Sequence, residues 1–217
     1  HSEVIDYVEE DLFMAPDLST IRKIPWNKEP TAQIICDLNY PSGEPSKLAP
    51  RQVLKNIINK LSDEHLQAVV APELEFYLCD QNLDPDLPLK TPIGKSGRRE
   101  TGSRVFGIDA VNEFDKLTDD IYDYCELMNI GVDTLVHESG PSQIEINLNH
   151  GDPLALADQA FMFKRAVRQV ALKHNIHATF MAKPYQGQPG SSMHIHQNLI
   201  SAKTGSNLFS DKEGNNS

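Results

Sequence analysis

Two histidines near residue 195 have the spacing of neighbouring ligands in one binding pocket. His194 and His196 belong to the segment M-H-I-H-Q-N-L, which follows a loop rich in glycine and proline. On a β-strand, residues two positions apart point to the same face and lie about 6.5 to 7 Å apart. That distance is too long for one small metal ion unless the strand bends, but it allows one histidine to bind a metal and the other a substrate anion. Alone, the pattern is more typical of a solvated surface strand, because histidines are commonly half exposed.

Four carboxylates upstream change this interpretation. Glu73 and Glu75 occur in P-E-L-E-F-Y, where they share one face of an otherwise apolar strand, and Glu138 and Glu145 occur in H-E-S-G-P-S-Q-I-E. Buried carboxylates side by side repel each other unless a cation or a shared proton offsets the charge. Carboxylates with a single imidazole suit Mg²⁺ or Mn²⁺ better than zinc. Four acids and a histidine exceed the needs of one ion, so the sequence predicts more than one metal ion, clamping a phosphate-bearing substrate between them.

Short β-rich segments predict the strands that position these residues. They cover residues 31–39, 68–78, 144–149, 176–182 and 193–197. Pro72 implies a bulge or an edge position for the second of these strands, because proline lacks the backbone N–H that a sheet requires. In residues 144–149 the isoleucines and the leucine face one way, and Glu145 faces the other way with two asparagines. This second face is either wet surface or the lining of a polar cavity.

Apolar residues at helical spacing predict three helices. The first begins at Pro50 and runs through Leu61, the second covers residues 111–128, and the third follows Asp152 as its N-cap. The inward-facing side chains are expected to be Val53, Ile57, Ile58 and Leu61 in the first helix, Val111, Phe114, Leu117, Ile121, Cys125 and Met128 in the second, and Leu156, Ala160, Phe163, Val167, Val170 and Ala171 in the third.

A basic tract follows the second predicted strand. Arg98, Arg99 and Arg104 lie in a long polar loop, where they form either a solvated basic surface or a contact to a substrate anion. The fragment G-K-S at residues 94–96 does not complete a phosphate-binding P-loop, because that motif requires a glycine at position 89, which is Leu89.

Composition narrows the classes of partner. The chain has 217 residues and a formal net charge of −11, which argues against a nucleic-acid partner or an anionic membrane surface. Three cysteines without a C-x-x-C motif indicate neither a disulfide framework nor a zinc site, and favour a reducing compartment. No apolar run approaches the roughly 18 to 20 residues that cross a bilayer, and residues 1–11 have no apolar signal segment. We therefore expect a cytoplasmic protein.

Four motifs together resemble the glutamine synthetase family: P-E-L-E-F-Y, H-E-S-G-P-S-Q-I-E-I-N, A-T-F-M-A-K-P and G-S-S-M-H-I-H-Q-N-L. The segments R-K-I-P-W, A-V-N-E-F-D, H-G-D-P-L and M-F-K-R-A-V-R are similar to its γ-glutamylpolyamine (γ-glutamylputrescine) synthetase branch. The resemblance covers nearly the whole chain and implies an α+β fold. Residues 1–45 would be the end of a β-grasp domain, and residues 46–217 the first half of a catalytic domain with a curved antiparallel sheet flanked by helices. Such a partial chain is expected to be inactive alone.

The resemblance also implies an activity, namely ATP-dependent ligation of the glutamate γ-carboxylate to an amine through γ-glutamyl phosphate. The implied partners are ATP, two or more Mg²⁺ or Mn²⁺ ions, glutamate, an amine, and further copies of the chain in a ring-shaped homo-oligomer. By similarity, the metal ligands are Glu75, Glu138 and Glu145 for one ion and Glu73 and His194 for the second; His196 is the catalytic residue at the nucleotide phosphates; Gly190, with Glu75 and His194, contacts glutamate; and Asn198 and His150 lie near adenine.

One departure from the family pattern concerns the amine. Ammonia-using members usually carry Asn-Gly where this chain has Pro189-Gly190, which favours a larger amine, such as putrescine, over ammonia. Three alternatives stay open: an ammonia-using glutamine synthetase, a non-catalytic structural or regulatory relative, and a small-molecule phosphotransferase. A metal-dependent oxygenase with H-x-H is disfavoured, because it requires a Glu where Ile200 and Ser201 stand.

Overall fold

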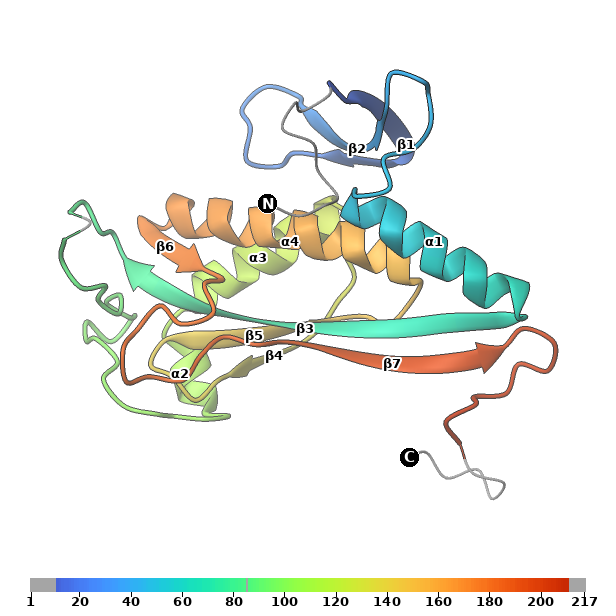
Figure 1. The fold of residues 1–217 in the computed structure, drawn as a ribbon. Helices are drawn as coiled ribbons and strands as arrows, with labels where there is room; N and C mark the ends of the chain where they lie inside the picture. The colour runs from blue at the N-terminus through green and yellow to red at the C-terminus, as the bar shows by residue number, and fades with distance from the viewer. Residues whose placement is uncertain (1–10, 85, 211–217) are drawn as a thin grey trace.

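The computed structural model describes residues 11–84 and 86–210, which form a two-stranded and a five-stranded antiparallel sheet together with helices. Figure 1 shows three layers: the small sheet lies on the three longer helices, and these helices lie on one face of the large sheet. The elements, in chain order, are β1 Phe13–Lys23, β2 Ala32–Asn39, α1 Pro50–Asp63, β3 Leu66–Asp80, α2 Ile108–Asn112, α3 Asp115–Leu127, β4 Val132–His137, β5 Gln143–Leu148, α4 Pro153–Lys173, β6 Ile176–Thr179 and β7 Met193–Ser201.

The long strand β3 organises the large sheet. It pairs with β5 along one edge, and β4 continues the sheet beyond β5. Along its other edge β3 pairs with β7 over residues 66–74 and with β6 over residues 77–80. Figure 1 shows β3 and β7 side by side beneath the helices. The acidic strand β3 therefore lies between β5 and the histidine strand β7.

The two faces of the large sheet have different chemistry. Leu74 and Phe76 of β3 and Ile144 and Ile146 of β5 are at most 1% exposed, and they share one core with apolar side chains of α3 and α4. Residues between them in sequence, such as Glu75, must point to the opposite face. The α+β class with an antiparallel sheet and helices is thus confirmed, and one face of the sheet is left for polar groups.

Arg51 of α1 joins the small sheet to the helices. Its guanidinium lies 2.6 Å from Asp17 of β1, 2.7 Å from Asp37 of β2 and 3.0 Å from Asp158 of α4. Hydrogen bonds from the side chains of Ser19 and Arg51 lower the pKa of Asp17 to about 2. This hairpin is the part of the predicted β-grasp domain that the structure describes, since residues 1–10 lie outside the described residues; the β-grasp assignment and the boundary at residues 45–46 stay predictions.

The third predicted helix and its cap are confirmed. The Asp152 side chain accepts a hydrogen bond from the backbone N–H of Ala155 at 2.9 Å, and all the predicted inward-facing residues of α4 are buried. The prediction of one continuous second helix is wrong, because this segment is divided into α2 and α3 at Glu113 and Phe114. The preceding loop binds Glu113 there: Lys95 N–H donates to its carbonyl and Ser96 N–H to its carboxylate, both at 2.9 Å.

The inward face predicted for the first helix is wrong in part. Val53 and Ile57 are each 47% exposed, whereas Leu54, Ile58 and Leu61 are half-buried where α1 contacts β3. Val53 and Ile57 each precede a contacting residue, Leu54 or Ile58, by one position. They therefore point about 100° away from the side of the helix that contacts β3, because successive helix residues are about 100° apart.

Two strand details bear on the sequence-based expectation. Pro72 pairs with Ile195 of β7 without a register shift, but on the β5 side the register shifts by one residue between the Glu73–Asn147 pair and the Val70–Gly151 bridge, as the predicted bulge requires. The backbone N–H groups of Val70 and Leu78 donate to the carbonyls of Gly151 and Ser142 on the β5 side. The backbone nitrogen of Pro72 therefore points to the same side, just beyond the last β3–β5 pair, where no N–H is required. The strand predicted for residues 176–182 ends at 179. Among the described helices, none has the length and apolar composition that a membrane crossing requires.

Candidate active site

The strand register brings the predicted site residues onto consecutive rows of the polar sheet face. Glu75 of β3 pairs with Glu145 of β5. Glu73 lies between Asn147 of β5 and His194 of β7 in the next row. Further along β7, His196 pairs with Ala71 and Asn198 pairs with Val69. Because directly paired residues point to the same face, these side chains line one surface.

Three of these side chains form a compact group of possible metal ligands. Ligand atoms of Glu73, Glu145 and His194 all lie within 4.8 Å of one another. His194 Nδ1 lies 3.3 Å from Glu73 Oε2, and His196 Nε2 lies 2.9 Å from Glu73 Oε1. Both histidines therefore converge on one carboxylate, and their side chains are 60% and 67% exposed.

The electrostatics of the group favour a bound cation. Glu145 is 8% exposed, and burial, followed by repulsion from Glu73, Glu138 and Glu75, raises its pKa to about 7. A divalent cation would offset both the burial of charge and the repulsion. Carboxylate oxygens with one imidazole fit the ligand preferences of Mg²⁺ and Mn²⁺, so the residues present fit the predicted metal.

The other two predicted acids lie near this group but have different contacts. Glu75 is 8% exposed, and its Oε2 accepts hydrogen bonds from Gln143 Nε2 and from Ser192 N–H, both at 3.0 Å. Glu138 Oε2 accepts from Ser139 N–H at 3.2 Å. The sequence-based grouping put Glu145 with Glu75 and Glu138, whereas the structure brings its carboxylate to Glu73 and His194. The roles of all five residues as metal ligands stay predictions.

Gly190 lies in a loop that β3 and β5 hold in place. Gln143 Nε2 donates to the Gly190 carbonyl at 2.9 Å, and Tyr77 Oη donates to the Pro189 carbonyl at 2.8 Å. A Cβ atom on Gly190 would lie 2.8 Å from the Ala182 carbonyl oxygen. The fold therefore requires glycine here, independently of the predicted contact with glutamate, which stays a prediction.

The two residues predicted near adenine lie on opposite sides of β3. Asn198 pairs with Val69 on one edge, and Gly151, next to His150, pairs with Val70 on the other edge. His150 is exposed, and Asn198 Oδ1 accepts a hydrogen bond from Asn207 Nδ2 at 3.0 Å. Their contact with a nucleotide stays a prediction.

Two residues that support the site, the half-buried Glu100 and the fully buried Gln143, were missed by the sequence reasoning. Glu100 Oε2 lies 2.9 Å from His137 Nε2 and accepts from Ser142 N–H at 2.6 Å. Burial alone would raise the pKa of Glu100, but these hydrogen bonds outweigh it and lower the pKa. Gln143 is fully buried and contacts Glu75. Glu100 is a single acid in a polar loop, without a periodic pattern that marks it.

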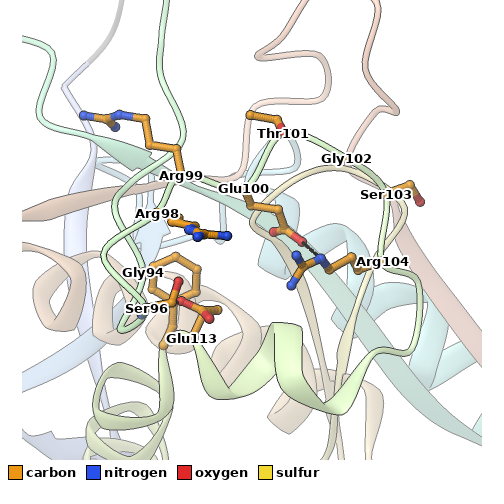
Figure 2. A pocket seen from close by; sticks show the side chains of 11 residues that line it. Gly94, Ser96, Arg98, Arg99, Glu100, Thr101, Gly102, Ser103, Arg104 and Glu113 are labelled. Carbon is orange, nitrogen blue, oxygen red and sulfur yellow. Dashed lines mark hydrogen bonds and ion pairs between the residues drawn. The ribbon is translucent and has the colours of Figure 1, made fainter.

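The basic loop forms a separate hollow of about 670 Å³ (Figure 2). The side chains of Arg98 and Arg104 point toward one another across this hollow, and Arg104 Nε lies 4.0 Å from Glu100 Oε1. Arg99 points away and pairs with Asp80 at 2.6 Å. None of the three arginines belongs to the group of Glu73, Glu145 and His194, and their predicted contact with a substrate anion stays a prediction.

The chain is similar in sequence to several known proteins. Residues 47–217 match the family described as glutamine synthetase, catalytic domain. The chain is 38% identical over 211 residues to γ-glutamylputrescine synthetase PuuA of Escherichia coli, covering 96% of this chain and 44% of PuuA. It is 32% identical over 207 residues to a glutamate–isopropylamine ligase of Pseudomonas sp, covering 94% and 43% of the two chains, and 34% identical over 211 residues to a glutamine synthetase of Thermus thermophilus, covering 94% and 45%.

A solved structure described as apo GmaS without ligand superposes with a TM-score of 0.80 at 25% identity, covering 97% of this chain and 48% of that one. The chain thus spans less than half the length of the curated relatives compared with it. The match over residues 47–217 and the antiparallel sheet with its acids and histidines on one face lead to one conclusion: the chain belongs to the glutamine synthetase family.

Proposed function

We propose that the intact protein joins the γ-carboxylate of glutamate to an amine at the expense of ATP. A γ-carboxylate oxygen attacks the γ-phosphorus of ATP, and ADP leaves. The amine nitrogen then attacks the γ-carbonyl carbon of γ-glutamyl phosphate, the carbon–oxygen bond to phosphate breaks, and the nitrogen loses a proton. The products are a γ-glutamyl amide, ADP and phosphate.

The observation that carries this proposal is the group of Glu73, Glu145 and His194, whose ligand atoms lie within 4.8 Å of one another. These residues would hold a divalent ion, and Glu75 and Glu138 would complete the set for two or more ions. When bound, Mg²⁺ or Mn²⁺ neutralises phosphate charge and polarises the phosphoryl group. The site is thus suited to bring two anions, ATP and glutamate, together.

The other predicted site residues would contact the nucleotide and glutamate. His196, whose Nε2 lies 2.9 Å from Glu73 Oε1 and whose side chain is largely exposed, would contact the nucleotide phosphates as a hydrogen-bond donor. The backbone at Gly190 would contact glutamate, and Asn198 and His150 would lie along the nucleotide. Each of these roles rests on the family resemblance and on the position of the residue.

For the amine, we propose a polyamine such as putrescine. Two relatives whose names specify an organic amine, PuuA and the isopropylamine ligase, are 38% and 32% identical to this chain. Pro189 in place of the usual asparagine supports the same choice. Ammonia is the second candidate, favoured by glutamine synthetases that are 33% and 34% identical.

The proposed assembly is a ring-shaped homo-oligomer in the cytoplasm. The ring comes from the family resemblance, and the cytoplasmic location comes from the three cysteines without a C-x-x-C motif, which favour a reducing compartment. The exposed apolar residues Met193 and Ile195 on β7 are consistent with further protein packing against this strand.

The test is ADP release by the intact protein with ATP, Mg²⁺ and glutamate, with ammonia, putrescine, spermidine and a simple monoamine offered in parallel. The γ-glutamyl amide is measured by mass spectrometry in the same reactions. Preference for a di- or polyamine supports the proposal, and turnover with ammonia alone assigns a glutamine synthetase. ADP release without any amine would indicate a phosphotransferase, and no release would indicate a non-catalytic relative or another acceptor.

A further inference from the structure

Gln143 lies where three parts of the candidate site meet. It is fully buried at the start of β5. Its Oε1 accepts a hydrogen bond from Gly140 N–H at 2.9 Å, and its Nε2 donates to Glu75 Oε2 at 3.0 Å and to the Gly190 carbonyl at 2.9 Å. Both N–H donors and the oxygen of this one amide are therefore used.

These bonds close a network around Glu75. The Ser192 N–H, two residues after Gly190, also donates to Glu75 Oε2 at 3.0 Å, and the Glu75 N–H donates to the Ser192 carbonyl at 3.2 Å. Two donors thus fix one carboxylate oxygen of Glu75. The loop of Gly190 and the Glu75 carboxylate are held by the same side chain, so displacement of one disturbs the other.

The third bond extends the network to the turn between β4 and β5. Gly140 lies in the turn that follows Glu138, and a Cβ at this glycine would lie 1.9 Å from Tyr77 Oη. Tyr77 in turn holds the loop at the Pro189 carbonyl, but no described hydrogen bond joins Tyr77 to Glu75. Tyr77 and Gln143 therefore both anchor the loop, and of these two side chains only Gln143 also contacts Glu75.

We infer that Gln143 is a positioning residue. It couples metal binding by Glu75 and the neighbouring acids to the order of the loop at residues 183–192, and hence to glutamate binding. This inference rests on the proposed function for the identity of the metal and of glutamate. Such coupling is reciprocal: glutamate tightens metal binding by the factor by which metal tightens glutamate binding.

The experiment compares wild type, Gln143→Met and Tyr77→Phe in the intact protein. Gln143→Met keeps a similar volume but removes all three hydrogen bonds, and Tyr77→Phe, the matched control, loosens the loop without touching Glu75. Hydrogen–deuterium exchange of residues 183–192 is measured without metal. Mn²⁺ affinity is measured by calorimetry with and without glutamate.

We expect faster loop exchange in both variants, by about tenfold or more. In wild type, glutamate should tighten Mn²⁺ binding by a factor of about 5 or more. In Gln143→Met, Mn²⁺ binding without glutamate should weaken about tenfold or more, as for other residues that orient metal ligands, and glutamate should no longer change it. In Tyr77→Phe, Mn²⁺ affinity without glutamate should stay within about twofold of wild type, because the Glu75 contacts remain.

The inference is overturned if Gln143→Met keeps the wild-type Mn²⁺ affinity and its response to glutamate, or if glutamate has no effect on Mn²⁺ binding in wild type. A wild type that binds no Mn²⁺ refutes the proposed function instead, and the metal-free exchange then still tests whether Gln143 holds the loop. If Gln143→Met does not fold, Gln143→Asn replaces it; its amide is one methylene too short to span Glu75 and Gly190, and the same losses are expected.

Discussion

His196 Nε2 lies 2.9 Å from Glu73 Oε1, although His196 pairs with Ala71 and not with Glu73 in the sheet. The contact is therefore diagonal across β3 and β7. His194 Nδ1 approaches the other oxygen of the same carboxylate at 3.3 Å. Glu73 thus joins the predicted metal-binding histidine to the predicted phosphate-binding one, and a bound cation would share its oxygens with both.

Replacing Glu73 with glutamine should weaken Mn²⁺ binding to the intact protein about tenfold or more, because a charged ligand is replaced by a neutral one of equal size. Folding should be retained, since the change also removes repulsion between Glu73 and Glu145. Calorimetric titration with Mn²⁺ measures the effect. The control is Glu64→Gln, an exposed acid at the end of α1; equal affinities in the two variants would refute the metal-ligand role.

Replacing Arg51 with methionine should lower the free energy of unfolding by about 2–3 kcal/mol, because Asp17, Asp37 and Asp158 lose their shared partner. Urea denaturation measures the change. Lys60→Met, at an exposed position of the same helix, should change stability by less than about 0.5 kcal/mol. Similar losses in both variants would show that the ion pairs of Arg51 contribute little.

The hydrogen bonds to Asp17, first from the Ser19 side chain and then from Arg51, predict a pH dependence. The folded pKa of Asp17 is about 2, below its ordinary value of 3.8, so its contribution is fully present above pH 4 and is lost as the pH falls toward 2. Stability of wild type should decline over this range more steeply than stability of Arg51→Met. Urea denaturation at pH 5, 4 and 3 compares the two slopes, and parallel slopes would contradict the prediction.

A methyl group at Gly140 should disturb both the turn after Glu138 and the loop of Pro189. Its Cβ would lie 1.9 Å from Tyr77 Oη, and displacement of Tyr77 breaks the bond to Pro189. Gly140→Ala should lower the free energy of unfolding by about 1–3 kcal/mol and reduce turnover. Gly102→Ala, where a Cβ has no neighbour within 4 Å, is the control, and wild-type stability and turnover in Gly140→Ala would contradict the geometry.

A polypeptide of residues 1–217 should self-associate in solution. Among the described strands β7 pairs with β3 alone, and Met193 and Ile195, on the face opposite the histidines, are 46% and 54% exposed. An open strand with exposed apolar residues favours intermolecular pairing. Light scattering after size exclusion should give a smaller mean mass for Ile195→Thr than for wild type. Val53→Thr on α1, 47% exposed, should have no such effect; a monomeric wild type would refute the prediction.

Periodicity and caps identified much of the fold from sequence, because they are local signals. Asp152 and the apolar stripe of α4 are one example, and the alternation that separates Glu145 from Ile144 and Ile146 is another. The division at Phe114 was not predictable in this way, because it depends on contacts from the distant Lys95 and Ser96.

The residues that share the polar sheet face were predictable as a set, but their geometry was not. The spacing of Glu73, Glu75, His194 and His196 predicted which side chains share a strand face. Which acid meets which histidine depends on the pairing of β3 with β5 and β7, which joins residues more than 60 positions apart. Gln143 was missed because one buried amide has no periodic signature, and its three partners meet only in the folded chain.

The most direct test of the central claim follows one oxygen atom. The intact protein is supplied with glutamate carrying ¹⁸O in its γ-carboxylate, together with ATP, Mg²⁺ and putrescine, or ammonia if only ammonia supports turnover. If ligation passes through γ-glutamyl phosphate, each phosphate released carries one ¹⁸O from glutamate, which mass spectrometry of the phosphate detects. Phosphate released without ¹⁸O during amide formation would contradict the account.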